Sequence, residues 1–245
     1  MSNPVVLITG GARGIGAGIA KSFLKAGYST MIADIGVNSD KTDWAYEFAT
    51  PSDINALKKE SPDLRACFVD VTNFKSCQEA VSQTIESFGR LDVLINNAGV
   101  VNSGPIESFD ETVWDKIFEV NTKGIFLMTK AALSDLKKSK APSIINTASI
   151  AGKKGYANMS AYCGSKFAAI GITQSLANEL APDGIRVNAI CPGMVGTAMW
   201  LDHLLPTNAT DHSQKTQEFE EMMQERIPPV SYTHLRAHET VLDVV

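Results

Sequence analysis

A tyrosine and a lysine four residues apart are the first side chains in this sequence that could do chemistry together. Tyr162 and Lys166 stand in the run Y-C-G-S-K, and on a helix this spacing places both on one face. A phenol has a pKa of about 10 and is a poor base at neutral pH, but a nearby ammonium favours the phenolate. We therefore expect this pair to exchange a proton with a bound molecule. Ser149, in N-T-A-S-I-A-G, can donate a hydrogen bond to an oxygen on which negative charge develops.

A second candidate site lies in the run T-G-G-A-R-G-I-G at 9–16, between a strand-like and a helix-like segment. Glycines there let the backbone turn tightly and approach a pyrophosphate, and the helix N-terminus offers unpaired N–H groups to the phosphates. The same glycines can also serve only the turn. The residues of this loop that are predicted to bind a cofactor are Gly10, Arg13, Gly14, Ile15 and Gly16.

An acidic residue at the end of the next strand-like segment supports a nucleotide site. Asp34 ends the run S-T-M-I-A-D, where a carboxylate can accept both ribose hydroxyls of an adenosine and repels a 2′-phosphate. Arg13 favours NADP instead, because its guanidinium can pair with such a 2′-phosphate. Since the charge of Asp34 lies where the 2′-substituent would be, the sequence favours NAD over NADP. The alternative is that Asp34 only begins the following turn.

The elements that must position these residues are of two alternating kinds. Short, nearly continuous apolar runs are typical of parallel strands buried on both faces, and helical patterns follow them. The predicted strands are 5–10, 29–35, 65–71, 91–99, 143–149 and 185–193, and the predicted helices are 14–27, 75–88, 110–137 and 159–181, with an extra turn or loop in 36–64. Six such strands with helical crossovers predict an α/β fold, a Rossmann-type doubly wound parallel sheet in three layers, α/β/α.

The composition fits one soluble domain over 1–229. The chain has 245 residues, of which 44% are hydrophobic and 20% charged. Residues 194–229 are predicted to form an excursion after the sixth strand. A net charge of −5 provides no electrostatic footprint for nucleic acid or membrane, and no apolar run approaches the ~20 residues of a membrane span. Scattered cysteines and a start without a secretory signal lead us to expect a cytoplasmic protein with reduced thiols.

Six motifs, in order, resemble the short-chain dehydrogenase/reductase family over almost all of residues 4–229. They are the glycine loop 9–16, N-N-A-G at 96–99, Asn121 in E-V-N-T-K-G, Ser149 in N-T-A-S-I-A-G, Y-C-G-S-K at 162–166 and P-G-M-V-G-T at 192–197. The resemblance implies hydride transfer between nicotinamide and a carbinol or carbonyl carbon, with Tyr162 moving the proton. It also implies that Lys166 binds the nicotinamide ribose and that the residue at Asn121 holds a water linking this lysine to solvent. The implied catalytic residues are Asn121, Ser149, Tyr162 and Lys166.

By matching motif, the resemblance also extends the predicted cofactor site. Asp70 and Val71 would contact adenine. Pro192 and Gly193 would lie beneath the nicotinamide, and Val195 and Thr197 would contact its carboxamide. The residues N-N-A-G would flank the adenosine. Of these, Asn96 is the one that an ordinary role at the end of a strand explains best. The predicted cofactor set is Gly10, Arg13, Gly14, Ile15, Gly16, Asp34, Asp70, Val71, Asn97, Ala98, Gly99, Tyr162, Lys166, Pro192, Gly193, Val195 and Thr197.

The substrate is less well indicated. This family builds its substrate lid after the position of Gly193, where Met194, Met199, Trp200 and His203 can line a pocket or, for the apolar ones, simply pack a helix against the body. The predicted substrate residues are Ser149, Tyr162, Met194, Met199 and Trp200.

Three functions remain open at this point. The run G-T-A-M-W together with Asp34 resembles the family's NAD-dependent polyol, sugar-alcohol and vicinal-diol dehydrogenases. The runs G-G-A-R-G-I-G and I-N-N-A-G-V equally resemble its 3-oxoacyl-[acyl-carrier-protein] reductases, which usually use NADPH, and Asp34 favours the first group. A catalytically silent nucleotide-binding sensor is disfavoured by the intact catalytic set.

The last residues, 230–245, contain His234 and His238 at helical spacing, followed by Glu239, as in a zinc-binding helix. The chemistry above needs no zinc, so we expect no metal site. Residues 230–240 match the translation of a transposon-end sequencing adapter, and the family continues here with a further helix and strand. We therefore expect a truncated chain with a non-native tail over 230–245, a missing final strand, and a homotetramer for the native product.

Overall fold

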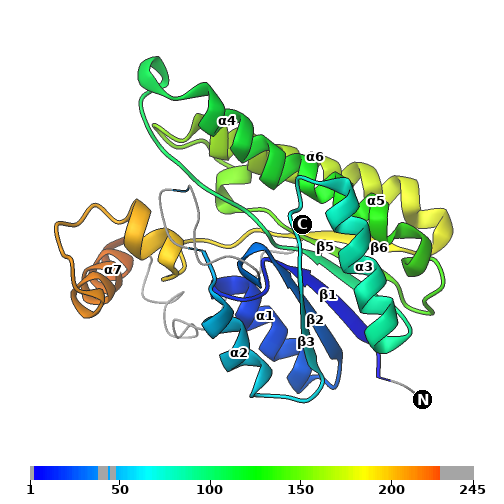
Figure 1. Cartoon of the computed structure of the whole chain (residues 1–245). Helices are drawn as coiled ribbons and strands as arrows, with labels where there is room; N and C mark the ends of the chain where they lie inside the picture. The colour runs from blue at the N-terminus through cyan, green and yellow to red at the C-terminus, as the bar shows by residue number, and fades with distance from the viewer. Residues whose placement is uncertain (1–2, 38–43, 45–47, 227–245) are drawn as a thin grey trace.

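The computed structural model describes residues 3–37, 44 and 48–226. They form a six-stranded parallel sheet in the order β3-β2-β1-β4-β5-β6 (Figure 1). The strands are β1 (Val5–Thr9), β2 (Ser29–Asp34), β3 (Leu64–Phe68), β4 (Val93–Asn96), β5 (Ser143–Thr147) and β6 (Arg186–Ile190). The strand order reverses between β1 and β4, and in such sheets a crevice opens at this point beyond the carboxyl ends of the strands. The predicted doubly wound sheet is confirmed.

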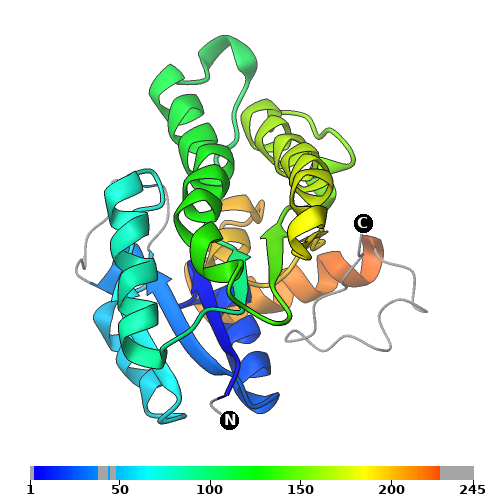
Figure 2. The ribbon, with the colours of Figure 1, turned by 90° about the vertical axis from the view of Figure 1, so that its right-hand side faces the viewer.

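Helices cover both faces of the sheet, giving the three expected layers (Figure 1, Figure 2). The helices α1 (Gly14–Lys25) and α2 (Pro51–Lys58) pack on one face, and α3 (Phe74–Phe88), α5 (Gly124–Leu136) and α6 (Ser160–Leu180) pack on the other. Along β1, Val6 and Ile8 belong to the core beneath α1 and α2, whereas Leu7 belongs to the core beneath α3 and α5. Since successive strand residues point to opposite faces, a strand with helices on both sides is apolar throughout.

The predicted helix 110–137 is interrupted. It consists of α4 (Glu111–Phe118), a π-helical turn (Glu119–Lys123) and α5, and the N–H of Gly124 donates to the carbonyl of Glu119 across this turn. Gly124 also lies against Val71, where a Cβ would come within 2.9 Å of the valine Cγ2. Such turns insert one extra residue and frequently occur at functional sites.

The chain leaves the sheet earlier than the apolar runs suggest. Strand β4 ends at Asn96 and β6 at Ile190, so the residues that follow form loops at the crevice instead of extending the strands. After β6 come a π-helical turn (Met199–Leu204) and α7 (His212–Arg226), which lie to one side of the sheet (Figure 1). Among residues 3–37, 44 and 48–226, no helix is long and apolar enough to cross a membrane.

The described part of the chain contains no seventh strand. The predictions for 230–245, including His234, His238 and Glu239, lie outside the described residues. The non-native origin of this segment remains a prediction, which sequencing of the source gene would test.

Candidate active site

The turn between β1 and α1 allows a close approach to its main chain. Gly10 and Gly14 have φ values of 60° and 50°, which favour glycine. A Cβ on Gly16 would lie 2.1 Å from the carbonyl oxygen of Gly10. Arg13 is the N-cap of α1, yet no side chain caps this helix, so no side chain competes for the N–H groups of its first turn. The uncapped N-terminus, with its positive dipole end, suits an anion.

Asp34 lies at the end of β2, directly beside this turn. Its carboxyl accepts the N–H of Ala12 at 3.1 Å and that of Gly36 at 3.0 Å, and its side chain is buried. Burial raises the pKa of Asp34, while these two N–H groups and the charge of Arg13 lower it. Arg13 itself donates from Nη1 to the carbonyl of Phe48 at 2.6 Å.

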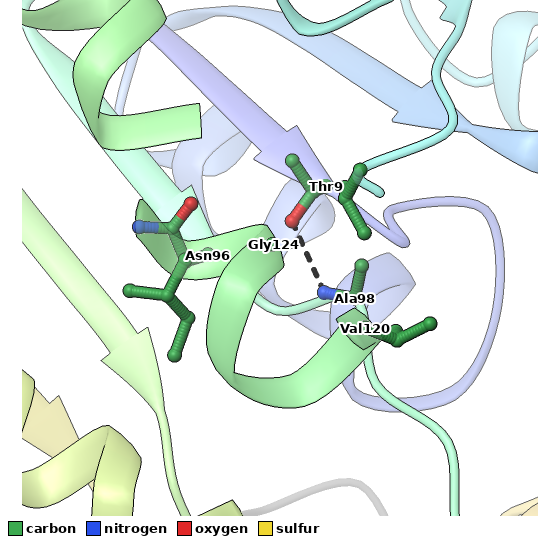
Figure 3. Close-up of a pocket in the computed structure, with 7 residues that line it drawn as sticks. Thr9, Asn96, Ala98, Val120 and Gly124 are labelled. Carbon is green, nitrogen blue, oxygen red and sulfur yellow. Dashed lines mark hydrogen bonds between the residues drawn. The ribbon is translucent and has the colours of Figure 1, made fainter. Parts of the chain in front are cut away.

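The loop after β4 is tied to β1 by Thr9. Its Oγ1 accepts the N–H of Asn97 at 3.0 Å and that of Ala98 at 3.1 Å (Figure 3). Asn97 Nδ2 donates back to the carbonyls of Thr9 and Gly10, at 3.1 and 2.9 Å. Nothing in the sequence marked Thr9, because a threonine ending a buried strand is ordinary.

A narrow pocket lies at the crevice between these strand ends and the start of α5 (Figure 3). Two residues of the predicted cofactor set, Val71 and Ala98, line it, together with Val120 from the π-helical turn and Gly124 from α5. Asp70, beside Val71, uses its carboxylate locally, accepting the N–H and hydroxyl of Thr72 at 2.9 and 2.7 Å.

The structure brings Tyr162, Lys166 and Ser149 together at the carboxyl end of β5. Lys166 is 4% exposed, and its ammonium donates to the carbonyl of Thr147 at 2.8 Å while lying 5.7 Å from the ring centroid of Tyr162. Ser149 follows β5 at the start of a 3-10 turn, where its hydroxyl accepts the N–H of Ala151 at 3.1 Å. A hydrogen bond also joins the side chains of Ser149 and Tyr162.

Burial controls the ionisation of both partners of the tyrosine–lysine pair. It raises the pKa of Tyr162 to about 12, although the hydrogen bond with Ser149 acts in the opposite direction. It lowers the pKa of Lys166 to about 8. The expectation that the lysine brings the tyrosine pKa down is therefore wrong for these side chains alone, because desolvation of the phenolate outweighs the favourable contacts.

Asn121 lies in the π-helical turn and is 1% exposed. Its Oδ1 accepts the N–H of Val100 at 2.8 Å, and its Nδ2 donates to the carbonyl of Val100 at 2.8 Å and to Ser165 Oγ at 3.0 Å. The side chain therefore links the loop after β4 to α6. The sequence contained no signal for Ser165 beyond its place inside Y-C-G-S-K.

The first residues after β6 contact the site. The carbonyl of Pro192 accepts the N–H of Ile150 at 3.1 Å, next to Ser149, and the methyl of Thr197 lies 3.1 Å from the place of a Cβ on Gly14. Met194 and Trp200, in contrast, pack with Leu201, Phe219 and Met223 in a core of their own, as the packing alternative for these residues anticipated. Met199 is half-buried and belongs to no core cluster among the described residues, and burial lowers the pKa of His203.

Comparisons with known proteins agree on one family. Residues 4–205 match the model of the short chain dehydrogenase family. Galactitol 2-dehydrogenase of Agrobacterium fabrum is 38% identical over 201 residues, which cover 82% of this chain and 73% of that protein. The crystal structure of carveol dehydrogenase from Mycobacterium avium in complex with NAD is similar at a TM-score of 0.76 and 31% identity, covering 82% of this chain and 74% of that one. The crystal structure of 3-ketoacyl-(acyl-carrier-protein) reductase from Brucella melitensis complexed with NADH is similar at a TM-score of 0.74 and 28% identity. The match covers 83% of this chain and 80% of that one.

Proposed function

Because the chain belongs to the short-chain dehydrogenase family, we propose that it transfers a hydride between NAD(H) and a polyol, sugar alcohol or vicinal diol. At the coarser level the family membership settles the class: the protein is an oxidoreductase that acts on CH–OH groups. The observation that carries the hydride-transfer proposal is the convergence of Ser149, Tyr162 and Lys166 at the carboxyl end of β5. The similarity to galactitol 2-dehydrogenase supports a polyol as the substrate, and Asp34 supports NAD.

The residues around the crevice fit a dinucleotide. A turn in which a Cβ on Gly10 or Gly16 would strike the main chain, followed by an uncapped helix N-terminus, suits the two phosphates. In this proposal Val71 and Ala98 contact the adenine side and Thr197 contacts the nicotinamide side; the position of Val71 and Ala98 in the pocket and of Thr197 next to Gly14 supports it. When bound, the nicotinamide supplies the site that accepts or gives the hydride.

Tyr162 moves the proton in this proposal. Its hydroxyl gives a proton to the carbonyl oxygen during reduction and takes it from the alcohol during oxidation, while the hydroxyl of Ser149 holds the same oxygen. With a pKa of about 12 the phenol is protonated at neutral pH, the state from which it gives its proton during reduction. During oxidation, the positive charge of an oxidised nicotinamide ring would add to that of the Lys166 ammonium already beside the phenol and favour the phenolate that takes the proton.

Asp34 supports NAD over NADP. Its carboxylate is buried, and a phosphate on the ribose 2′-oxygen would face it in a poorly solvated place where repulsion is strong. Arg13, the residue that favours NADP, already donates to the carbonyl of Phe48. The NAD and NADH bound to the Mycobacterium avium and Brucella melitensis proteins fit the same choice.

The test is an initial-rate assay with hexitols, vicinal diols, ketoses and diketones, using NAD(H) and NADP(H) in parallel. We expect turnover of at least one polyol or diol with NAD(H), and Tyr162→Phe should lower kcat by about 10²–10⁴-fold while leaving NADH binding intact. Equal or faster turnover with NADPH would refute the argument from Asp34.

Two alternatives remain as outcomes of the same assay. A 3-oxoacyl reductase, favoured by the Brucella melitensis relative, would reduce acetoacetyl thioesters in preference to ketoses, with NADPH as the expected coenzyme. A catalytically silent nucleotide sensor would bind NADH without turning over any member of the panel.

Three further expectations belong with this proposal. All four cysteines, Cys67, Cys77, Cys163 and Cys191, are buried free thiols, which supports a cytoplasmic location. We propose that residues 1–229 act as one domain. We also propose a homotetramer for the native product, supported by the half-exposed rings of Phe126 on α5 and Phe167 on α6, and light scattering measures its mass.

A further inference from the structure

The start of α6 lacks a side-chain cap, although Tyr162 lies in its first turn. The helix begins at Ser160, and its N-cap, Met159, provides no side-chain hydrogen bond. First turns without caps leave backbone N–H groups unpaired and fray more readily than the middle of a helix. The position of the tyrosine therefore depends on what else holds this turn.

A buried side-chain relay reaches the peptide of Tyr162 from outside the helix. Ser165 is 0% exposed, and its hydroxyl donates to the carbonyl of Tyr162 at 2.7 Å and accepts from Asn121 Nδ2 at 3.0 Å. Asn121 is in turn fixed by two hydrogen bonds to the main chain of Val100, both 2.8 Å. The next residue, Thr122, donates from its hydroxyl to the carbonyl of Ser165 at 3.5 Å. Two residues of the π-helical turn, Asn121 and Thr122, are thus hydrogen-bonded to Ser165, the residue whose hydroxyl donates to the carbonyl of Tyr162.

We propose that Ser165 is a positioning residue, which holds the main chain of Tyr162 to Asn121 and thereby fixes the tyrosine hydroxyl against Ser149. The proposal rests on the proposed function only for the role of Tyr162. It assigns Asn121 a second task, anchoring α6. Its physical basis is that both residues are buried and that Asn121 Nδ2 donates one N–H to the carbonyl of Val100 and the other to Ser165 Oγ, so removing the hydroxyl leaves one buried N–H without this acceptor and Tyr162 free to shift.

The same helix contains a matched control. Thr173 donates from its hydroxyl to the carbonyl of Ala169 at 2.7 Å and accepts from Asn146 Nδ2 at 2.9 Å, and it is also buried. Its chemistry repeats that of Ser165, but it lies in the middle of α6, away from the tyrosine. Ser165→Ala and Thr173→Val should therefore cost similar stability, and only the first should alter the reaction.

The experiment measures both variants in the full chain by steady-state kinetics and by ¹⁹F NMR titration of fluorotyrosine-labelled protein, with Tyr162→Phe assigning the resonance. We expect Ser165→Ala to lower kcat roughly tenfold or more, since a displacement of about 1 Å costs on the order of 10²-fold, with the KM for coenzyme unchanged. The Tyr162 titration should move to higher pH as its hydrogen bond with Ser149 weakens. The other titratable groups beside the phenol, Lys166 and Cys163, are the same in every variant. Thr173→Val should leave both quantities unchanged.

Equal losses of kcat in Ser165→Ala and Thr173→Val, or an unmoved Tyr162 titration in Ser165→Ala, would overturn the proposal. If Ser165→Ala does not fold, Ser165→Cys keeps a weaker donor and acceptor in the same place, and the proposal then requires an intermediate shift of the titration. The NMR readout needs no turnover, so a chain without activity on any substrate would refute the proposed function while leaving Ser165 testable.

Discussion

Two glycines of α1, two residues apart, have opposite surroundings. A Cβ on Gly16 would strike the carbonyl of Gly10 at 2.1 Å and the side-chain amide of Asn97 at 2.7 Å. A Cβ on Gly18 would meet nothing within 4 Å. The first glycine therefore serves the close contact of helix and turn, and the second only lowers the helix propensity of α1.

The alanine variants should consequently diverge. Gly18→Ala should raise the free energy of unfolding by about 0.5–1 kcal/mol, the usual gain for an exposed helical glycine. Gly16→Ala should lower it and weaken NADH binding, because the added methyl pushes α1 away from the turn. Thermal unfolding and a fluorescence titration with NADH measure the two effects, and similar behaviour of both variants would contradict this reading of the turn.

Residue types and spacing predict which side chains meet, but not what each one bonds. Tyr162 and Lys166 share a helix face, and Ser149 follows shortly after β5, a strand that the sequence predicts, so their convergence follows from the sequence. The roles of Thr9 and Ser165 do not follow, since a hydroxyl satisfies many partners and only the packed fold selects one. The pKa of Tyr162 likewise depends on burial, which no motif specifies.

At the scale of elements, the segment after β6 packs mainly on itself. Leu201, Phe219 and Met223 form its core, with Met194 and Trp200 against them, and Phe219 also touches the place of a Cβ on Gly196 at 3.3 Å. This self-contained packing makes α7 and the π-helical turn before it one unit, which we call the lid. Losing a core contact in the lid should loosen this unit without unfolding the sheet.

Phe219→Ala tests this independence. A buried phenylalanine replaced by alanine typically costs about 3–5 kcal/mol of local packing. We expect faster proteolytic cleavage within 194–226 and a higher KM for substrate, with little change in the melting temperature of the sheet. Phe23→Ala is the control, because Phe23, on α1, packs against the core between that helix and the sheet. It should lower the melting temperature and leave cleavage of the lid unchanged.

Apolar runs predict the strands and helices because burial on both faces leaves a continuous signal along each strand. They do not predict where β4 and β6 end, since the loop residues after them are also apolar or small. The sequence does not predict the π-helical turn either, because Glu119–Lys123 continues the helical pattern. The extra residue of this turn is seen only in the fold, where Gly124 packs against Val71.

For the whole molecule, several buried groups prefer to be uncharged. Burial lowers the pKa of Lys166 to about 8 and raises those of Tyr162, Cys67 and Cys77 to about 12. The lysine charge destabilises the fold below pH 8, and this cost disappears as the pH rises towards the ordinary lysine pKa of about 10.5. The tyrosine and the thiols act in the opposite sense, so their stabilising contribution is lost as the pH rises towards 12.

Lys166→Met isolates the lysine contribution. At pH 7 the variant avoids a burial cost on the order of 3 kcal/mol, from which the lost hydrogen bond to Thr147 subtracts a constant amount. Relative to wild type, the variant should therefore lose stability steadily between pH 8 and 10.5, because wild type gains there. Urea unfolding of both proteins at pH 7 and pH 10 measures the difference, in which tyrosine and cysteine ionisation cancels. A difference that does not change with pH would show that the buried ammonium carries no such cost.

The strand order also determines when, during translation, each neighbour of β1 becomes available for pairing. Strand β1 lies in the middle of the sheet, with Val6 beside Thr30 on one edge and beside Val93 on the other. At about 5–20 residues per second, the stretch of chain between Val6 and Val93 takes roughly 4–17 seconds to emerge from the ribosome. Throughout that interval one edge of the most buried strand has no partner, so the nascent protein depends on chaperones soonest at its N-terminal end.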